Sequence, residues 1–320
     1  MNRHRRVLVT GGAGFIGSHL SDAILKHGFE VTILDNLHTG IRGQVPAGAD
    51  FIEGDVRDSD AVARAFETEP EIVCHLAGQA SIRLAWADPS ADLAVNVEGT
   101  LRILAACREH RVPRLLYASS MTVYGNPDEI PTSEDAPARP VAHYGITKFA
   151  AERYVHLAAD DPEHPLAVTS FRMFNVFGPR QRLDNPYQGV LAIFLGNVLR
   201  GEAVTIHSDG EQSRDFVFVG DVCRAWIEAI DNQSTFGRVF NLGSGRPTTV
   251  NTLCDTVLGL CGLDRSNHPV HHEPAQPGDI RRAAADVSAI QETLGWQPKI
   301  SLEEGLEPTV AWARHAAERR

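Results

Sequence analysis

A short apolar strand that ends in a cluster of glycines is the feature that most constrains this chain. Residues 6–10 read Arg-Val-Leu-Val-Thr, a run typical of a buried parallel strand. Gly12, Gly14 and Gly17 follow with the spacing G-x-G-x-x-G. Such a loop makes a tight turn, lets the backbone approach a pyrophosphate and packs the next helix on the strand. The helix predicted over residues 15–26 then directs its free N–H groups at the phosphate, so the sequence predicts a dinucleotide site.

A second apolar strand, residues 31–34, ends in Asp35, about 20 residues beyond the loop, where a carboxylate can accept from a ribose 2′-hydroxyl. The same carboxylate repels a 2′-phosphate, so we expect NAD rather than NADP. Arg42 follows in a predicted loop and is interpreted as a surface arginine. Asp55, with Val56 after it, either flanks the adenine or stabilises a turn, and both interpretations stay open.

Predicted strands and helices alternate through the first half of the chain. The strands cover residues 49–52, 72–76, 115–118 and 167–172, and the helices cover residues 93–109 and 144–158. This alternation predicts an α/β fold with a doubly wound parallel Rossmann sheet. Two later strand-like stretches, 215–219 and 239–242, are interpreted as returns to that sheet. We therefore predict an NAD-binding domain of residues 1–174 and 215–242, and a smaller interleaved substrate domain of residues 175–214 and 243–320.

Composition excludes several classes of protein. The formal net charge is −11 and no basic stripe is present, so no nucleic-acid partner is expected. No apolar run is long enough to span a membrane, and no apolar signal core follows the basic start. The five cysteines are scattered without a C-x-x-C pair, which fits reduced thiols and a cytoplasmic location. His268, His271, His272 and Glu273 are irregularly spaced in a segment expected to be a loop and are interpreted as solvated, so no metal site is predicted.

Tyr144 and Lys148 are spaced i and i+4, so a helix would place them on one face. The lysine ammonium, together with the positive charge of a nearby NAD, is expected to favour the tyrosinate and lower the pKa of the tyrosine. Ser120 follows a predicted strand, and active-site residues in such sheets lie at the carboxyl ends of the strands. Its hydroxyl can relay a proton. The pair alone would suit a solvated helix face. Combined with the glycine loop and Ser120, it predicts a proton-transfer site.

Seven segments of the chain resemble the extended short-chain dehydrogenase/reductases that act on nucleotide sugars: residues 10–20, 34–36, 75–78, 118–125, 144–148, 172–180 and 209–216. The resemblance covers nearly the whole chain. It implies a tightly held NAD, a nucleotide-diphosphate hexose as substrate, and a homodimer formed through a four-helix bundle of the helices near residues 92–109 and 144–158. The cofactor contacts that it implies are Gly11, Gly14, Phe15, Ile16, Gly17, Asp35, Asn36, Asp55, Val56, Leu76, Ala77, Gly78, Asn96, Ser119, Tyr144, Lys148 and Met173.

Two positions decide which reaction the resemblance implies. Dehydratases of this family carry an Asp-Glu pair where this chain has Met121 and Thr122, and nucleotide-uronic acid decarboxylases carry a Glu in place of Thr122. Neither side chain acts as an acid or base near neutral pH. A 4-keto intermediate then has one fate, return of the hydride to its other face, which is 4-epimerisation. Residues 118–125 look most like UDP-hexose 4-epimerases, so Ser120 is the expected catalytic hydroxyl and Thr122 a substrate contact.

The resemblance also places the nucleotide-sugar contacts. Asn175 and Arg214 are expected at the diphosphate, and Asp279 at the ribose of the nucleotide. Arg214 could instead form a surface ion pair with Asp215 or Asp209. Two departures stand out. The first is Gln276, where an arginine is usual and Arg281 could compensate. The second is Met173, where an aromatic residue against the nicotinamide is usual.

Two further features bear on the sugar. Ala283 stands where 4-epimerases of narrow specificity carry a gating tyrosine, which leaves room for an N-acetyl group. Arg180 and Arg182 lie where uronic-acid epimerases have a basic loop, although they could equally face the diphosphate or solvent. UDP-glucuronate and UDP-N-acetylglucosamine are therefore candidates beside UDP-glucose and UDP-galactose. A nucleotide-sugar ketoreductase and a non-catalytic NAD-binding regulator remain as alternatives.

Overall fold

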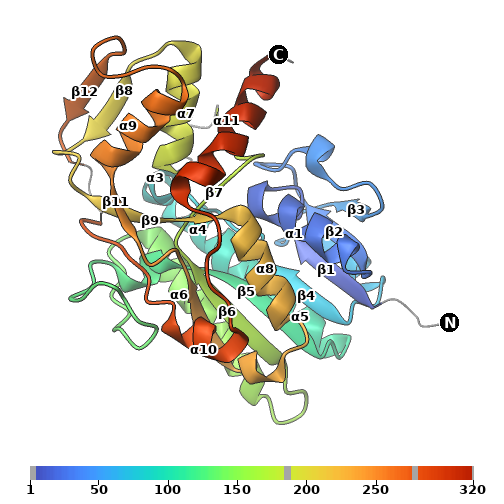
Figure 1. The fold of residues 1–320 in the computed structure, drawn as a ribbon. Helices are drawn as coiled ribbons and strands as arrows, with labels where there is room; N and C mark the ends of the chain where they lie inside the picture. Colours follow the sequence, from blue (N-terminus) through green and yellow to red (C-terminus); the bar gives the residue numbers. More distant parts are fainter. Residues whose placement is uncertain (1–4, 184–188, 276–279, 319–320) are drawn as a thin grey trace.

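The computed structural model describes residues 5–183, 189–275 and 280–318. Its centre is a seven-stranded sheet of order β10-β6-β5-β4-β1-β2-β3, in which every neighbouring pair is parallel. The strands are β1 (Arg6–Thr10), β2 (Glu30–Asp35), β3 (Asp50–Glu53), β4 (Ile72–His75), β5 (Arg114–Ser120), β6 (Ala167–Met173) and β10 (Arg238–Leu242). Helices cover both faces (Figure 1), so the predicted doubly wound α/β fold is confirmed.

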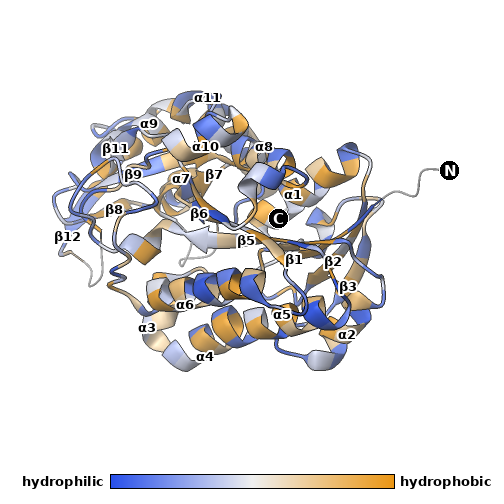
Figure 2. Ribbon diagram, turned by 90° about the horizontal axis from the view of Figure 1, so that it is seen from below, coloured by the Kyte–Doolittle hydropathy of each residue, from blue (hydrophilic) through white to orange (hydrophobic). Residues whose placement is uncertain are grey.

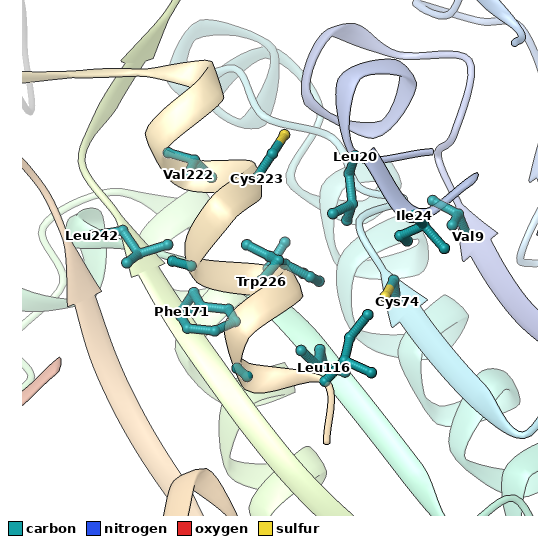
Figure 3. Close-up of a cluster of buried hydrophobic side chains, with 14 of the residues drawn as sticks. Val9, Leu20, Ile24, Cys74, Leu116, Phe171, Val222, Cys223, Trp226 and Leu242 are labelled. Atoms are coloured by element: carbon teal, nitrogen blue, oxygen red, sulfur yellow. The ribbon is translucent and has the colours of Figure 1, made fainter. Parts of the chain in front are cut away.

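Each face of the sheet buries one hydrophobic cluster. The helices of one face are α1 (Phe15–Lys26), α8 (Val219–Ala229) and α10 (Ser288–Leu294), and those of the other are α2 (Ser59–Phe66), α5 (Gly99–Glu109) and α6 (His143–Leu157) (Figure 2). Val9 of β1 joins the first cluster and Leu8 the second, because side chains alternate along a strand. In the first cluster Trp226 packs against Phe171 with ring centroids 5.1 Å apart (Figure 3).

The glycine loop adopts a conformation that only glycine permits. Gly11 has a φ of +72°, and a Cβ on it would lie 2.8 Å from the backbone nitrogen of Ala77. A Cβ on Gly17 would lie 2.1 Å from the carbonyl oxygen of Gly11. The first turn of α1 therefore packs directly on the loop, as the spacing predicts.

A second group of elements surrounds the carboxyl edge of the large sheet. One small sheet has the order β11-β9-β7, and β8 pairs with β12 in another. The elements are β7 (Asn175–Phe177), β8 (Val204–His207), β9 (Ser213–Phe218), β11 (Pro247–Thr249), β12 (Val270–Glu273), α7 (Val190–Arg200), α9 (Val250–Leu260) and α11 (Leu302–Glu318). Residues of α7, α9, α11 and these strands form a hydrophobic cluster of their own.

The structure corrects two expectations about strands. β9, predicted as residues 215–219 returning to the large sheet, lies between β7 and β11, because the place beside β6 is taken by β10. The predicted domain boundary at residue 215 thus falls inside β9, and the return to the large sheet is made by α8 and β10. β12 lies in the stretch expected to be a loop. Its mostly exposed, polar side chains mask its pairing with β8.

The predicted helix over residues 93–109 is divided. α3 (Ile82–Ala87) and α4 (Pro89–Leu93) lead into a π-helical turn, Ala94–Glu98, before α5 begins at Gly99. π turns widen a helix locally and occur often at functional sites. Short 3₁₀ turns cover Arg42–Gln44, Met121–Tyr124, Ala158–Asp160 and Gln233–Thr235. Among the described residues, no helix is both long and apolar enough to cross a membrane.

The crowding around Gly11 gives a test of the loop. Gly11→Ala and Gly28→Ala both force alanine into left-handed backbone, but nothing lies within 4 Å of a Cβ on Gly28. We expect Gly28→Ala to cost about 1 kcal/mol of unfolding free energy, and Gly11→Ala to cost at least about 2 kcal/mol more because the backbone of Ala77 must shift. Urea denaturation followed by circular dichroism measures both. Equal losses would show that the contact with residue 77 is not restrictive.

Candidate active site

The predicted site residues gather at the carboxyl ends of four adjacent strands. The glycine loop follows β1, residues 76–78 follow β4, Ser120 ends β5 and Met173 ends β6. The parallel register aligns Thr10 with His75 and Ser120 with Met173, so these strand ends lie at one edge of the sheet. Ligands bind in the crevice at this edge in open α/β sheets.

The edge offers a cradle for a dinucleotide. Gly14 caps α1 without any side-chain hydrogen bond to the first turn, so the N–H groups of that turn are left to a ligand. Asp35 Oδ2 accepts from the backbone nitrogen of Ala13 at 2.9 Å, and Oδ1 accepts from Leu37 at 2.8 Å. Burial raises the pKa of this carboxyl. Asp35 thus holds the glycine loop, and its contact with a ribose stays a prediction.

Asp55 and Asn36 form a polar turn beside β3. Arg57 binds the Asp55 carboxylate through Nε at 2.9 Å and a terminal nitrogen at 2.8 Å, and Asn36 Nδ2 donates at 2.7 Å. The guanidinium keeps the pKa of Asp55 well below its usual range. These contacts favour the turn interpretation of Asp55. Val56 is buried beneath the turn.

Asn96 lies in the π turn and is almost fully buried. Its Oδ1 accepts from the backbone nitrogen of Gln79 at 2.9 Å, and its Nδ2 donates to the carbonyl oxygen of Gln79 at 3.1 Å. A Cβ on Gly78 would lie 2.9 Å from Asn96 Oδ1 and 3.8 Å from Lys148 Nζ. Asn96 therefore shapes the segment after β4 through its side chain, next to the ammonium of Lys148.

Tyr144 and Lys148 lie on α6 and face the end of β5. Lys148 Nζ lies 4.4 Å from the centre of the Tyr117 ring, a cation–π contact. Burial raises the pKa of Tyr144 to about 12, although a hydrogen bond with Ser120 opposes this. Burial also lowers the pKa of Lys148 to about 7. The groups of the chain itself therefore do not lower the pKa of Tyr144 as expected, because desolvation outweighs the favourable contacts.

Ser120 has the geometry of a proton relay. Its Oγ accepts from the hydroxyl of Thr122 at 2.9 Å and from the backbone nitrogen of Thr122 at 3.3 Å. Both contacts use lone pairs of the oxygen, so its own hydrogen is left to donate to Tyr144 or to a substrate oxygen. Thr122 thus orients Ser120, a role that the resemblance did not imply.

A buried ion pair supports this edge, and the sequence analysis did not find it. Arg172 donates to Glu152 at 2.6 Å and 3.0 Å, and Ser119 Oγ donates to the same carboxylate at 2.6 Å. The hydroxyl of Ser119 is therefore engaged, and only its backbone remains for the predicted cofactor contact. The available signal was spacing, because Glu152 follows Lys148 by four residues and shares its helix face.

The predicted substrate contacts lie around β7 and β9. Asn175 begins β7, and its Oδ1 is buried with no hydrogen-bond partner among the described residues, so this oxygen can accept a hydrogen bond from a ligand donor. Arg214 in β9 donates to the carbonyl oxygens of Ser213 at 2.8 Å and Ile280 at 2.5 Å. Asp279 and Gln276 lie outside the described residues.

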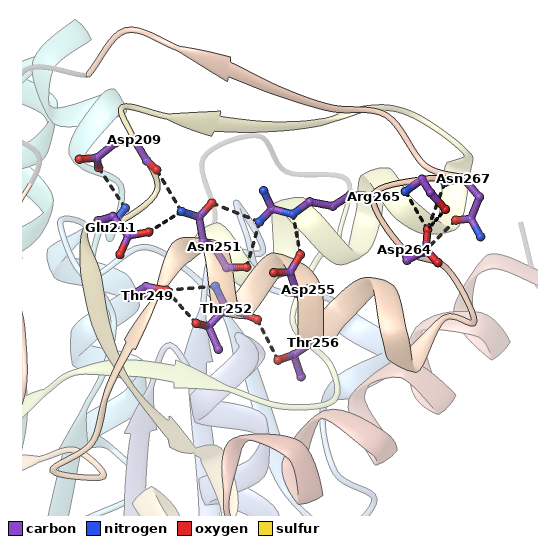
Figure 4. Close-up of polar contacts among 11 residues, drawn as sticks. Asp209, Glu211, Thr249, Asn251, Thr252, Asp255, Thr256, Asp264, Arg265 and Asn267 are labelled. Carbon is purple, nitrogen blue, oxygen red and sulfur yellow. Dashed lines mark hydrogen bonds and ion pairs between the residues drawn. The ribbon is translucent and has the colours of Figure 1, made fainter.

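The carboxylates that could have paired with Arg214 have other partners. Asp215 is fully buried and accepts from the backbone nitrogens of Ser244, Gly245 and Ala285. Asp209 pairs with Arg281 at 2.6 Å, next to the polar cluster of α9 (Figure 4). Arg281 is thereby tied to a surface carboxylate, which does not favour its expected role at the phosphate.

The three residues expected to affect sugar specificity lie in different surroundings. Arg180 pairs with Asp22 of α1 at 2.6 Å, whereas Arg182 is half-buried in the loop after β7. Ala283 is 1% exposed and packs in a cluster with Met121 and Phe174, so its methyl group is covered. The expected open space at Ala283 stays a prediction.

The histidine-rich stretch holds no cluster of metal-binding side chains within the described ranges. His268 is buried and bonds the carbonyl oxygen of Glu202 at 2.9 Å. The expectation that it is solvated was wrong. His271 and His272 are exposed on β12. Arg42 is exposed as expected, and it stacks on the Phe51 ring at 3.8 Å.

Comparisons with known proteins agree with this geometry. Residues 7–243 match the model of the NAD dependent epimerase/dehydratase family. A UDP-glucose 4-epimerase of Mycolicibacterium smegmatis is 37% identical over 98% of this chain and 100% of its own length. UDP-glucuronate 4-epimerase 3 of Arabidopsis thaliana is 32% identical over 96% of this chain and 76% of its own. The crystal structure of Thermus thermophilus UDP-glucose 4-epimerase in complex with NAD has a TM-score of 0.90 and 38% identity, covering 97% of this chain and 99% of that one.

Asp35 gives a test of the cofactor cradle. In Asp35→Asn one oxygen still accepts from Leu37, but the new amide opposes the N–H of Ala13, so the loop loses a charged hydrogen bond. We expect the Kd for NAD, measured by isothermal titration calorimetry, to rise about tenfold. Asp58→Asn is the matched control, because Asp58 also accepts from a backbone N–H two residues on, at the start of α2. An unchanged Kd in Asp35→Asn would contradict the role of Asp35.

Proposed function

Because the chain belongs to the NAD dependent epimerase/dehydratase family and is an NAD-dependent epimerase, we propose that it inverts C4 of a nucleotide-diphosphate hexose of the UDP-glucose/UDP-galactose type. One observation carries this proposal. Ser120, Tyr144 and Lys148 meet at the edge that holds the glycine loop, with no second acid or base at Met121 or Thr122.

In the proposed reaction, Tyr144 and Ser120 have different roles in moving the proton. NAD held by the glycine loop and the first turn of α1 would supply the reversible hydride acceptor for C4 of the sugar. Tyr144 takes the proton of the C4 hydroxyl as the hydride leaves and gives it back at the end. With its pKa raised to about 12, Tyr144 is protonated in the free protein, so the positive charges of Lys148 and of the cofactor must lower that pKa for the first step. Ser120 conducts the proton between the substrate oxygen and Tyr144.

The neighbours of Ser120 restrict the outcome to epimerisation. Met121 is buried in an apolar cluster with Tyr124 and Phe174. Thr122 is bonded to Ser120 and has no titratable group near neutral pH. Elimination or decarboxylation of a 4-keto sugar needs an additional acid–base group at this place, so return of the hydride to the other face is the supported fate.

The substrate diphosphate is proposed to lie between β7 and β9. Arg214 offers a guanidinium, the group best suited to a bidentate phosphate contact, and Asn175 would donate to the phosphate through its Nδ2. The relative from Arabidopsis thaliana acts on UDP-glucuronate, and Arg182 is the nearby cation that could fork onto a C6 carboxylate. UDP-N-acetylglucosamine is the third candidate, because the resemblance places Ala283 where 4-epimerases of narrow specificity carry a gating tyrosine, although its methyl group is covered in this structure. UDP-glucuronate and UDP-N-acetylglucosamine are thus the alternative sugars.

A product analysis tests the proposal. Incubation with UDP-glucose, UDP-glucuronate and UDP-N-acetylglucosamine, each carrying deuterium at C4, should give the C4 epimer by proton NMR with the deuterium retained at C4. Hydride return requires this retention, and no net reduction of the cofactor should accompany it. Stoichiometric cofactor reduction would instead indicate a ketoreductase, and no conversion of any sugar would favour a non-catalytic NAD-binding protein.

Tyr144→Phe is the control for this experiment. It removes only the hydroxyl, so bound NAD should be retained while turnover of the best sugar falls by about 10² to 10⁴. Full activity of this variant would remove Tyr144 from the mechanism.

A homodimer is proposed through α5 and α6, which lie along one outer face of the molecule (Figure 2). Large apolar side chains are exposed there, and Leu157 is 65% exposed. Leu101, Tyr154 and Leu157 also line a groove of about 880 Å³ between the ends of the two helices. Exposed apolar patches of this kind mark interaction surfaces. Two copies, each contributing both helices, would bury these side chains in a four-helix bundle.

Leu157→Glu tests the dimer. A carboxylate in an apolar interface opposes association, so light scattering should show the mass of one chain instead of two at micromolar concentration. Ile300→Glu is the control, since Ile300 is an exposed apolar residue outside these helices. A wild-type protein with the mass of one chain would refute this proposal.

A further inference from the structure

Asp92 is a buried carboxylate that the proposed reaction does not use. It lies in α4 and is 1% exposed. Its Oδ1 accepts from Gln79 Nε2 at 2.7 Å and from Asn96 Nδ2 at 3.1 Å, and its Oδ2 accepts from Thr147 Oγ1 at 2.6 Å. The three donors come from the segment after β4, the π turn and α6. One carboxylate therefore joins three segments that border the proposed active site.

The network of Asp92 reaches the surroundings of Lys148. Thr147 directly precedes Lys148 on α6. Asn96, bonded to Asp92, lies across Gly78 from Lys148 Nζ, since a Cβ on that glycine would contact both side chains. A displacement of Asp92 would therefore move both the helix that carries the lysine and the segment that it faces.

Several ionisable groups surround the Lys148 ammonium. Burial lowers the pKa of Lys148 to about 7, while the carboxylates of Glu152 and Asp92 raise it. His75 from β4 is neutral, because burial lowers its pKa to about 3. The Tyr117 ring from β5 contacts the ammonium, and Tyr144 lies one turn away on α6. Of these groups, all within the described part of the chain, only the two carboxylates supply negative charge near neutral pH.

The two carboxylates differ in how far they are already neutralised. Glu152 is paired with Arg172 at 2.6 Å, so much of its charge is compensated at contact distance. The three side chains bonded to Asp92 are neutral. Burial raises the pKa of Asp92, while its hydrogen bonds with Thr147 and Gln79 and the nearby Lys148 act to lower it. Both carboxylates act on Lys148, Glu152 more strongly, but among the hydrogen-bond contacts described Asp92 is the one of the two without a cation at contact distance.

We propose that Asp92 is a positioning residue whose negative charge keeps Lys148 protonated beside Tyr144 and whose hydrogen bonds fix α6 against the segment after β4. The proposal rests on the proposed role of Tyr144 and Lys148 in 4-epimerisation. The charged lysine is what makes proton removal by Tyr144 possible, so Asp92 acts on the reaction through Lys148 without touching the substrate.

Asp92→Asn removes the charge with little change of shape. The remaining oxygen can still accept from Gln79 and Asn96, and the new amide can donate to Thr147 Oγ1. Thr147 can then direct its own hydrogen to the carbonyl oxygen of Tyr144, which lies 3.1 Å away. Asp92→Ser is a second, smaller variant without charge, and circular dichroism verifies the fold of both.

The sequence offers a direct readout, because it contains only three lysines, Lys26, Lys148 and Lys299. In protein labelled with ¹³C at the lysine ε-carbon, an NMR titration follows each ammonium, and Lys148→Arg assigns the signal. We expect the wild-type Lys148 to titrate below Lys26 and Lys299. In Asp92→Asn its pKa should fall by about one further unit or more, while the other two lysines stay unchanged.

Thr147→Val separates charge from hydrogen bonding, since it removes one donor and leaves the carboxylate. Its Lys148 signal should titrate close to the wild type. In activity measurements, the alkaline limb of kcat/KM in Asp92→Asn should move to lower pH by the same amount as the NMR shift. The NMR result does not require turnover, so it distinguishes failure of this inference from failure of the proposed function.

Three outcomes would overturn the inference. The first is an unchanged Lys148 titration in a folded Asp92→Asn or Asp92→Ser. The second is an equal shift in Thr147→Val, which would make the effect one of packing. The third is a wild-type Lys148 that titrates together with Lys26 and Lys299, because the ammonium would then need no support. This last measurement requires no variant to fold.

Discussion

The rest of the structure depends on how the polar side chains on one face of α6 are buried. Tyr144, Lys148 and Glu152 follow each other at intervals of four and press against the end of β5. Buried charges are tolerated only when they are paired and hydrogen-bonded. Arg172 from β6 and Ser119 from β5 satisfy Glu152. The strand order that places β6 beside β5 is thus also what makes a buried Glu152 possible next to the site.

The same burial determines how the site can work. It moves the pKa of Tyr144 up and that of Lys148 down, so burial disfavours the charged form of both groups. In the proposed mechanism, proton transfer at neutral pH requires that both pKa shifts become smaller when the ligands bind. A positive charge near Tyr144 lowers the pKa of the tyrosine, which in the proposed mechanism links binding of the cofactor to activation of the base. The negative charge of Asp92 favours a protonated Lys148 but also raises the pKa of Tyr144.

Sequence periodicity predicted the elements better than their partners. The limits of β1 and α1 agree with the prediction, because alternation and helical spacing report burial directly. β9 was recognised as a strand and assigned to the wrong sheet, since burial does not say which neighbour covers a strand. The π turn has no pattern of its own. The role of Asp92 was also not predicted, because its partners Gln79 and Thr147 are distant in sequence.

The cofactor side and the substrate side of the edge are also joined by α1. His19 bonds the carbonyl oxygen of Pro179 at 2.9 Å, and Asp22 pairs with Arg180 at 2.6 Å. Both partners lie in the loop that continues to Arg182. The glycine loop, which Asp35 holds, lies at one end of α1. The loop that contains Pro179 and Arg180 is bonded to the side of the same helix. In the proposed reaction, the same element would therefore set the position of the dinucleotide and that of the sugar carbon beside it, as hydride transfer to and from one carbon requires.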